Sequence, residues 1–215
     1  MINLKTFIFN PFQVNAFVLY DESCDCVIVD AACYEEEEYT QLFEFISLKG
    51  LKPKAVLNTH GHVDHLTGSK RVCEKYDIGL FMHSADLPLL ESAQVHGKTF
   101  GFSIELPPEP RSWLSDGQVF PFGNSEIKIW HTPGHSPGSL IFYMENEKLL
   151  ITGDVLFSGS IGRTDLPGGD FGQLINSIQT KILVLPRETR VFPGHGSETN
   201  VGTEADHNPF LNRSS

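Results

Sequence analysis

Four short apolar runs in this chain lead directly into turns that carry histidine or aspartate, and this repeated arrangement constrains the fold most. The four segments are "AVLNTHGHVDH", "IKIWHTPGH", "LLITGDVLF" and "RVFPGHG". Apolar runs of this length, bounded by turn residues, are typical of buried strands. If the strands end at the same edge of their sheets, the polar side chains converge there, where folds commonly build sites. The converging residues would be His60, His62, Asp64, His65, His135, Asp154 and His195.

The other periodic segments predict a layered α/β fold. Strand-like runs cover residues 2–9, 13–20, 26–32, 117–122 and 139–144, and helical patterns cover 35–49, 66–76 and 171–182. Because the helices flank runs of strands instead of alternating strictly with them, two sheets are favoured over one doubly wound parallel sheet. We see no repeat and no linker, so we expect residues 1–215 to form one domain. The Gly/Pro-rich stretch 96–112 is expected to be a loop insertion.

Composition limits the classes of partner. The 215 residues are 40 % hydrophobic, enough for a sizeable core, and the formal net charge of −11 disfavours nucleic acid. No run is long enough to span a bilayer, and the N-terminus lacks the pattern of a secretion signal. The four cysteines show no paired spacing, which favours free thiols in a reducing cytoplasm. We therefore expect a cytoplasmic protein with a small-molecule partner, and the sequence does not indicate its oligomeric state.

The cluster H-x-H-x-D-H indicates a metal site, because core packing does not require four titratable side chains within six positions. Residues two apart in an extended segment point the same way, so His60 and His62 can hold one ion together. Asp64 and His65, at the start of a helix, can hold a second ion. Seven ligands shared by two ions leave positions open for water, which is typical of a catalytic site. We expect two divalent ions, with zinc favoured and iron or manganese as alternatives.

The other histidines are less suited to coordination. His83, His96 and His207 lack ligand-like neighbours and are expected at the surface. His131 lies on a strand, which favours packing or support of a ligand over coordination. Taken alone, His195 and Asp154 are also compatible with turn residues.

The motifs "THGHVDH", "TPGHSPGS", "TGDVLF" and "FPGHG", in this order, resemble those of the metallo-β-lactamase-fold hydrolases over essentially the whole chain. Within that superfamily, "GDVLFSGSIGRTDLPGGD" and "PGHGSETNVGTEADHNPFL" resemble the short glyoxalase II-like branch. The resemblance implies a four-layer αβ/βα sandwich with a binuclear site at one edge of the two sheets. It also implies the ligand sets: His60, His62 and His135 for the first metal, Asp64, His65 and His195 for the second, and Asp154 as the bridge.

The same resemblance implies hydrolysis of a glutathione-type thioester, such as S-lactoylglutathione, by a metal-bridging hydroxide. A thioester suits this chemistry because its leaving thiolate comes from a thiol with a reference pKa of about 8.5. Asp64 would bind metal and orient the hydroxide, and no Ser or Cys lies in a nucleophile motif. Lactam-cleaving members typically have cysteine where this chain has Asp154, which argues against antibiotic hydrolysis.

Two further residues are candidates for supporting roles. Arg163 in "GRTD" suits a substrate carboxylate, with an ion pair to Asp165 or Asp170 as the alternative. Asp30 at the end of "VIVD" is a candidate partner for a ligand histidine, with a plain turn residue as the alternative. The long glyoxalase II enzymes have a C-terminal helical domain that has no counterpart here, so we expect glutathione to be recognised differently.

Two other functions remain open from the motifs. Persulfide dioxygenases of the same superfamily have a similar "GRTD" segment and use one iron held by two histidines and an aspartate, here Asp154 with two of His60, His135 and His195. A metal-binding protein without catalysis is the third interpretation, and open metal positions make it the weakest.

Overall fold

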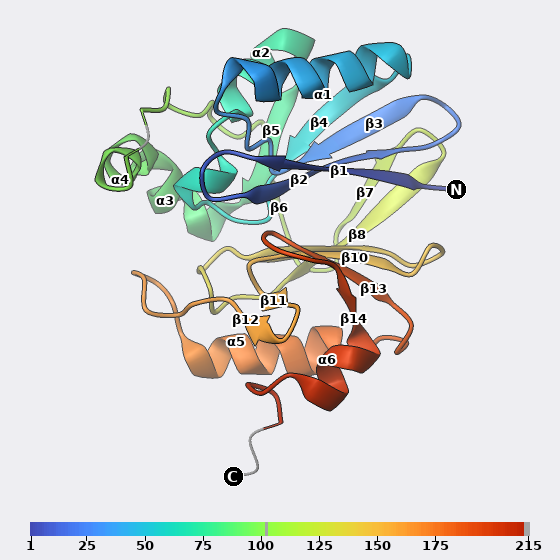
Figure 1. Ribbon diagram of the computed structural model, residues 1–215, viewed down its shortest axis with the longest axis vertical. Helices are drawn as coiled ribbons and strands as arrows, with labels where there is room; N and C mark the ends of the chain where they lie inside the picture. The colour runs from blue at the N-terminus through green and yellow to red at the C-terminus, as the bar shows by residue number, and fades with distance from the viewer. Residues whose placement is uncertain (102, 213–215) are drawn as a thin grey trace.

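The computed structural model describes residues 1–101 and 103–212, in which two β-sheets pack face to face with helices on their outer sides (Figure 1). This is the four-layer αβ/βα sandwich that the resemblance implied. In Figure 1, α1 (Glu36–Leu48) and α2 (Ser69–Tyr76) cover the upper sheet. The lower sheet is covered by α5 (Phe171–Ser177), which a π-helical turn at Ile178–Ile182 extends, and by α6 (Val201–His207).

The first sheet begins with an antiparallel meander and continues with parallel strands. Its order is β1 (Asn3–Phe9), β2 (Val14–Tyr20), β3 (Asp25–Val29), β4 (Lys52–Leu57), β5 (Gly79–His83) and β6 (Ser112–Leu114). Helices α1 and α2 connect the parallel strands β3, β4 and β5, as a parallel pair requires a crossover.

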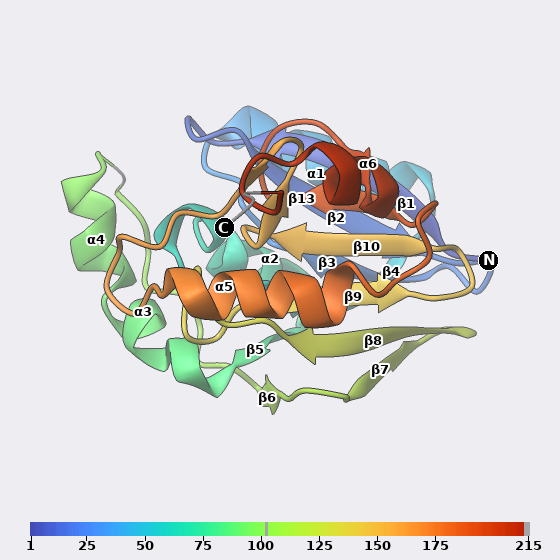
Figure 2. The ribbon, with the colours of Figure 1, turned by 90° about the horizontal axis from the view of Figure 1, so that it is seen from below.

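The second sheet is antiparallel except for the parallel pair β10·β13. Its order is β14 (Thr199–Asn200), β13 (Arg190–Pro193), β10 (Leu149–Gly153), β9 (Leu140–Met144), β8 (Ser125–His131) and β7 (Val119–Phe122). A small hairpin, β11 (Leu156–Phe157) with β12 (Ser160–Ile161), follows β10. Figure 2 shows the arrowheads of β8 and β10 pointing toward the end of the molecule where α3 (Leu87–Glu91) and α4 (Ala93–Thr99) lie.

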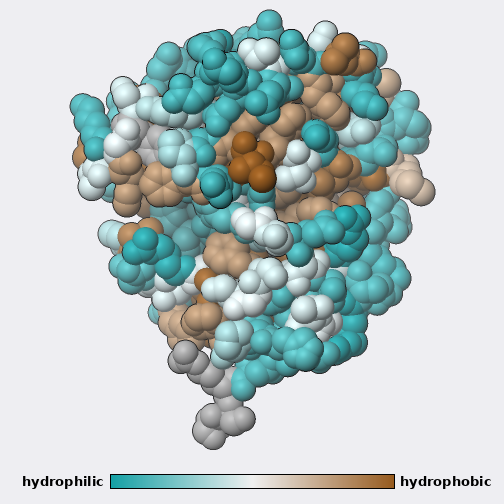
Figure 3. Space-filling view, in the orientation of Figure 1, coloured by the Kyte–Doolittle hydropathy of each residue, from teal (hydrophilic) through white to brown (hydrophobic). Residues whose placement is uncertain are grey.

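The core has three layers, as a sandwich of this kind requires. Side chains such as Phe17 and Leu57 from the first sheet meet Phe142 and Ile151 from the second in the central layer. Separate apolar layers lie between each sheet and its helices. On the face seen in Figure 1, hydrophilic side chains cover much of the upper and lower helical layers, and hydrophobic ones gather over the strands between them (Figure 3).

Helix α1 illustrates how local sequence sets an element. Glu35 and Glu38 form a reciprocal capping box at its start, and the acidic run that follows lies in the first turn, where the helix dipole favours negative charge. Tyr39, Leu42 and Ile46 form its buried face. The predicted helix over 35–49 is therefore confirmed, and Gly50 follows with a positive φ of 63°.

The prediction of a loop over residues 96–112 is partly wrong. Helix α4 extends into it as far as Thr99, and β6 begins at Ser112, so the described residues 100–101 and 103–111 form the loop. The helix forms because Ala93 and Gly97 are buried and α4 packs on the 3-10 turn Val63–His65. In the described part of the chain no helix is long and apolar enough to cross a bilayer.

Candidate metal centre

The four apolar runs end at one edge of the sandwich, and the seven candidate ligands meet there. His60 and His62 follow β4, and the 3-10 turn Val63–His65 presents Asp64 and His65. His135 lies between β8 and β9, Asp154 directly follows β10, and His195 follows β13. The predicted convergence is therefore what the structure shows, and the residues form three overlapping groups whose ligand atoms lie within 4.8 Å of one another.

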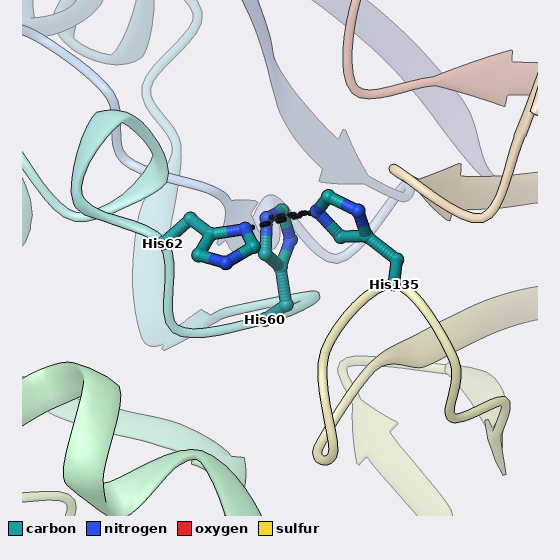
Figure 4. A group of neighbouring side chains, drawn as sticks. All are labelled: His60, His62 and His135. Atoms are coloured by element: carbon teal, nitrogen blue, oxygen red, sulfur yellow. Dashed lines mark hydrogen bonds between the residues drawn. The ribbon is translucent and has the colours of Figure 1, made fainter. Parts of the chain in front are cut away.

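The first group consists of three imidazoles that face one another (Figure 4). His135 Nε2 lies 2.9 Å from His62 Nδ1 and 3.3 Å from His60 Nε2. Neutral imidazole nitrogens are the commonest nitrogen ligands of zinc. Three of them converging from two separate loops leave a point that one divalent ion fits.

The second group combines two imidazoles with a carboxylate. His65 Nε2 lies 3.3 Å from His195 Nε2, and Asp64 Oδ2 lies 3.4 Å from His195 Nε2 and 3.7 Å from His65 Nε2. This set of two nitrogens and one oxygen suits zinc, iron and manganese alike.

Asp154 lies between the two groups and tests whether metal ions fit the site. Its Oδ1 lies 3.4 Å from His65 Nε2, and its Oδ2 lies 3.6 Å from both His135 Nε2 and His195 Nε2. Oδ1 is buried and has no hydrogen-bond partner among the described residues. Leaving a buried charged acceptor unsatisfied costs about 1–3 kcal/mol or more, and a shared cation would satisfy it. The donor set therefore fits two divalent ions with Asp154 between them.

Hydrogen bonds fix which ring nitrogen three of the histidines present. His135 Nδ1 donates to the carbonyl of Arg163 at 2.8 Å, and His195 Nδ1 donates to the carbonyl of Phe12 at 2.9 Å. His65 Nδ1 lies 2.9 Å from Asp30 Oδ2. A neutral imidazole that donates through Nδ1 presents an unprotonated Nε2, the form that binds a metal.

Asp30 supports both groups. Its fully buried carboxylate contacts His65 and accepts hydrogen bonds from the amide of Thr59 at 2.8 Å and from the hydroxyl of Thr59 at 2.7 Å. Because that hydroxyl donates to Asp30, it accepts from His60 Nδ1, 3.0 Å away. Sequence reasoning named Asp30 but missed Thr59, whose only signal is its position directly before the histidine cluster.

Burial and neighbouring charge set the protonation of the ligands. Burial lowers the pKa of His60 well below its usual value, and the neighbouring imidazoles, His65 first, lower it further. Burial likewise lowers the pKa of His62 to about 4. Burial would raise the pKa of Asp154, but the charge of the neighbouring histidines, His65 first, outweighs it, so this carboxyl is held in its anionic form. His60 and His62 are thus neutral imidazoles, and Asp154 is an anionic carboxylate.

His65 shows that the site favours positive charge. Burial alone would lower its pKa, but Asp64, Asp154 and Asp30 together raise it well above the usual value. Three carboxylates around one imidazole create a negative potential that a divalent ion also satisfies.

A pocket of about 330 Å³ opens above the ligands. Most of its wall is apolar, contributed by Phe12, Val63, Leu89, Phe100, Leu166 and Pro167. The rings of Phe12 and Phe100 pack edge to face with centroids 6.1 Å apart. The polar wall includes His96, which was expected at the surface and is instead half-buried. His96 lies in the pocket wall because it belongs to α4, which forms where part of the loop was expected.

The remaining histidines do not join the ligands. The rings of His83 and His131 stack 4.1 Å apart at 8°, so His83 is half-buried and not simply a surface residue. His131 Nε2 also lies 2.8 Å from the carbonyl of Pro137, in the loop that carries His135, which agrees with a packing or supporting role. His207 is exposed, as expected.

Arg163 lies in the pocket wall and makes a two-pronged ion pair with Asp165. Nε and Nη2 each lie 2.7 Å from one of the two carboxylate oxygens. Asp170 instead caps α5 by accepting from the amide of Gln173 at 2.8 Å. The alternative of an ion pair with Asp165 is thus present, and binding of a substrate carboxylate by Arg163 stays a prediction.

Among curated relatives, the probable metallo-hydrolase YqgX of Bacillus subtilis is 41 % identical over 203 residues, 94 % of each chain. The hydroxyacylglutathione hydrolase GloC of Haemophilus influenzae is 34 % identical over 216 residues, the whole of both chains.

Solved structures agree with the fold. BLEG-1 B3 metallo-beta-lactamase is 37 % identical with a TM-score of 0.89, covering 98 % of this chain and 100 % of that one. TTHA1623 in a di-iron-bound form is 39 % identical with a TM-score of 0.87, covering 96 % of this chain and 100 % of that one. Residues 9–195, which include all seven candidate ligands, match the metallo-beta-lactamase superfamily. The sandwich, the ligand motifs at its edge and this match agree: the chain belongs to the metallo-beta-lactamase superfamily.

Proposed function

We propose that this metal-dependent hydrolase cleaves thioesters of the glutathione type, such as S-lactoylglutathione, with two divalent ions held by its seven clustered side chains. The observation that carries the proposal is the pair of ligand groups joined by Asp154 at the floor of an apolar pocket. The full-length similarity to a hydroxyacylglutathione hydrolase supports the choice of thioester.

The chain's own residues define how the site would act. His60, His62 and His135 would hold one ion, and Asp64, His65 and His195 the other, with Asp154 shared. Bound divalent ions supply Lewis acidity and lower the pKa of coordinated water. Asp64 lies in the pocket wall, where its second carboxylate oxygen could orient the attacking water. No serine or cysteine is among the described residues that line the pocket, which favours water over a side chain as the nucleophile.

The apolar wall supports a substrate with an uncharged reacting end. Phe12 and Phe100 line the pocket above the ligands, where a bound acyl group would pack against them and displace water. Water exclusion strengthens the electrostatic interactions that stabilise the developing oxyanion. A thioester has a neutral carbonyl and a poorly hydrated sulfur, so it would lose little solvation on entering this pocket.

The metal identity and the cellular setting are parts of the same proposal. Zinc suits the ligand set, and the di-iron form of TTHA1623 supports iron as an alternative, with manganese as a third. We propose a cytoplasmic protein that acts on a small molecule and, given its net charge of −11, does not bind nucleic acid.

A second candidate substrate is a β-lactam. It is favoured by the similarity to a protein named B3 metallo-beta-lactamase at 37 % identity. Asp154 in place of cysteine is therefore not enough by itself to exclude lactams, and a lactam belongs in the substrate test.

The experiment combines metal analysis with three assays on the purified chain loaded with zinc, iron or manganese. We expect two ions per chain and hydrolysis of S-lactoylglutathione, with little cleavage of a chromogenic cephalosporin. One iron per chain with oxygen uptake on glutathione persulfide would replace the proposal with a persulfide dioxygenase. Two ions with cephalosporin cleavage and no thioester turnover would move the substrate to lactams.

A further inference from the structure

Asp86 is a buried carboxylate near the seven candidate ligands but is not one of them. It ends the 3-10 turn Ser84–Asp86 between β5 and α3 and is fully buried. Its Oδ2 accepts the amide of Gly61 at 2.8 Å and the hydroxyl of Ser136 at 2.7 Å, and its Oδ1 accepts the amide of Gly138 at 2.6 Å. Among the described residues it has no ion-pair partner, so these three donors carry its stabilisation.

The donors belong to the two loops that form the first ligand group. Gly61 lies between His60 and His62, and Ser136 directly follows His135. One carboxylate therefore joins the loop after β4 to the loop between β8 and β9, which come from different sheets.

Gly61 and Gly138 lie too close to Asp86 for a larger residue at either position. A Cβ on Gly61 would lie 3.0 Å from Asp86 Cβ, and one on Gly138 would lie 2.6 Å from Asp86 Cγ. Glycine at both positions lets the two backbones approach the carboxylate directly, so small changes at Asp86 would change the separation of the loops.

The second ligand group has supporting contacts that do not involve Asp86. His65 contacts Asp30, and His195 contacts the carbonyl of Phe12. Asn15 binds the carbonyls of Pro193 and Gly196 on either side of His195, both at 2.9 Å. Among the described residues, the hydrogen bonds of Asp86 thus reach neighbours of His60, His62 and His135 and none of the residues adjacent to Asp64, His65 or His195.

We propose that Asp86 is a positioning residue that sets the geometry, and hence the affinity, of the His60–His62–His135 metal position. It would act through Gly61 and Ser136 without touching metal or substrate. The inference rests on the two-metal site of the proposed function but not on the identity of the substrate.

The variant Asp86→Asn tests the proposal at nearly constant volume. Asparagine keeps one acceptor oxygen but replaces the other with an NH₂ donor, which would face the donors that now bind Asp86. The amide of Gly61 or that of Gly138 then loses its acceptor, because these two donors bind different oxygens of Asp86. Loss of a group that orients metal ligands typically weakens metal affinity by about 10- to 100-fold.

Asp21 provides a matched control. It is also buried, and its carboxylate accepts from the amide and hydroxyl of Ser23, from the amide of Asn124 at 2.8 Å and from the hydroxyl of Ser125 at 2.7 Å. These bonds join the β2–β3 and β7–β8 turns at the opposite end of the sandwich, beside the start of β1. Asp21→Asn thus breaks a similar buried clamp far from the ligands.

The experiment titrates the chelated full-length wild type, Asp86→Asn and Asp21→Asn with Co²⁺, following visible absorption and calorimetry, with thermal unfolding measured in parallel. We expect two binding steps in the wild type, one of them weakened by at least about tenfold in Asp86→Asn, and both unchanged in Asp21→Asn. Ser136→Ala removes one donor and should weaken the same step by less; it also serves if Asp86→Asn does not fold.

The inference would be overturned if Asp86→Asn binds both ions with wild-type affinity. It would also be overturned if Asp86→Asn weakens both binding steps equally and by no more than Asp21→Asn does. The titration contains no substrate, so failure of the thioester proposal does not affect it. Binding of a single Co²⁺ by the wild type would contradict the two-metal site itself. In that case the inference about Asp86 survives only if Asp86→Asn weakens that one binding step relative to Asp21→Asn.

Discussion

At the residue scale, the site depends on side chains in which one polar atom is already hydrogen-bonded and the other faces the cluster. His65, His135 and His195 each hold one ring nitrogen against an oxygen acceptor and present the other to the cluster. Asp154 is the exception, since its Oδ1 is buried without a partner among the described residues. The arrangement is therefore already oriented to hold cations and would reorganise little on binding them.

Asp154→Ala is the most direct residue-scale prediction. Removing the shared carboxylate should reduce thioester turnover by at least about 100-fold, because the water is no longer placed between two ions. The chelated variant should unfold at the same temperature as the chelated wild type or higher, since a buried unsatisfied carboxylate is lost. Steady-state kinetics and circular dichroism melting measure the two effects. Retained turnover would count heavily against the bridging position.

Arg163 and Asp165 allow a paired prediction. If Arg163 holds a substrate carboxylate, Arg163→Ala should raise KM for S-lactoylglutathione by about fivefold, corresponding to about 1 kcal/mol for an exposed ion pair. Asp165→Ala should lower KM, because it releases the guanidinium from its present partner. Initial-rate measurements on both variants decide the matter. Unchanged KM in both would leave Arg163 with the ion pair alone.

At the element scale, α4 matters because it forms one wall of the pocket and packs on the turn that carries Asp64 and His65. The sequence predicted the strands before the ligands well, because each is a short apolar run followed by turn residues. It did not predict α4, whose segment "AQVHGKT" contains a glycine and no apolar periodicity. Strand β5 was also missed, since "GLFMH" is too short for its periodicity to be read. Both elements depend on tertiary packing.

Phe100→Ala tests the function of this wall. We expect KM for an apolar acyl thioester to rise about threefold to tenfold, as lost aromatic contacts are worth about 0.5–1.5 kcal/mol. Phe171→Ala is the matched control, because Phe171 and Phe100 are both 48 % exposed but Phe171 does not line the pocket. Equal effects of the two substitutions on KM would contradict a role for this wall of the pocket in substrate binding.

At the scale of the whole molecule, the metal centre joins segments from both sheets. The motifs predicted the sandwich and the convergence of the seven candidate ligands, because each candidate lies in a segment that follows an apolar strand. They could not predict Thr59 or Asp86, whose roles depend on contacts with Asp30 and with the loop after His135. Single polar residues carry no sequence signal for such long-range hydrogen bonds.

Metal removal should therefore destabilise the entire fold. At a free metal concentration 100 times Kd, binding to the native state adds about 2.7 kcal/mol, which is about 5–10 °C in Tm for a chain of this size. Calorimetry before and after chelation measures the shift, and adding zinc back should restore it. An unchanged Tm after verified metal loss would show that the ions do not couple the sheets.

The central claim is that these seven side chains bind two divalent ions, and anomalous diffraction from crystals of the zinc-loaded chain tests it most directly. We expect two peaks, one within bonding distance of His60, His62 and His135, the other within bonding distance of Asp64, His65 and His195, with Asp154 reaching both. A single peak, or peaks elsewhere with these imidazoles turned apart, would contradict it.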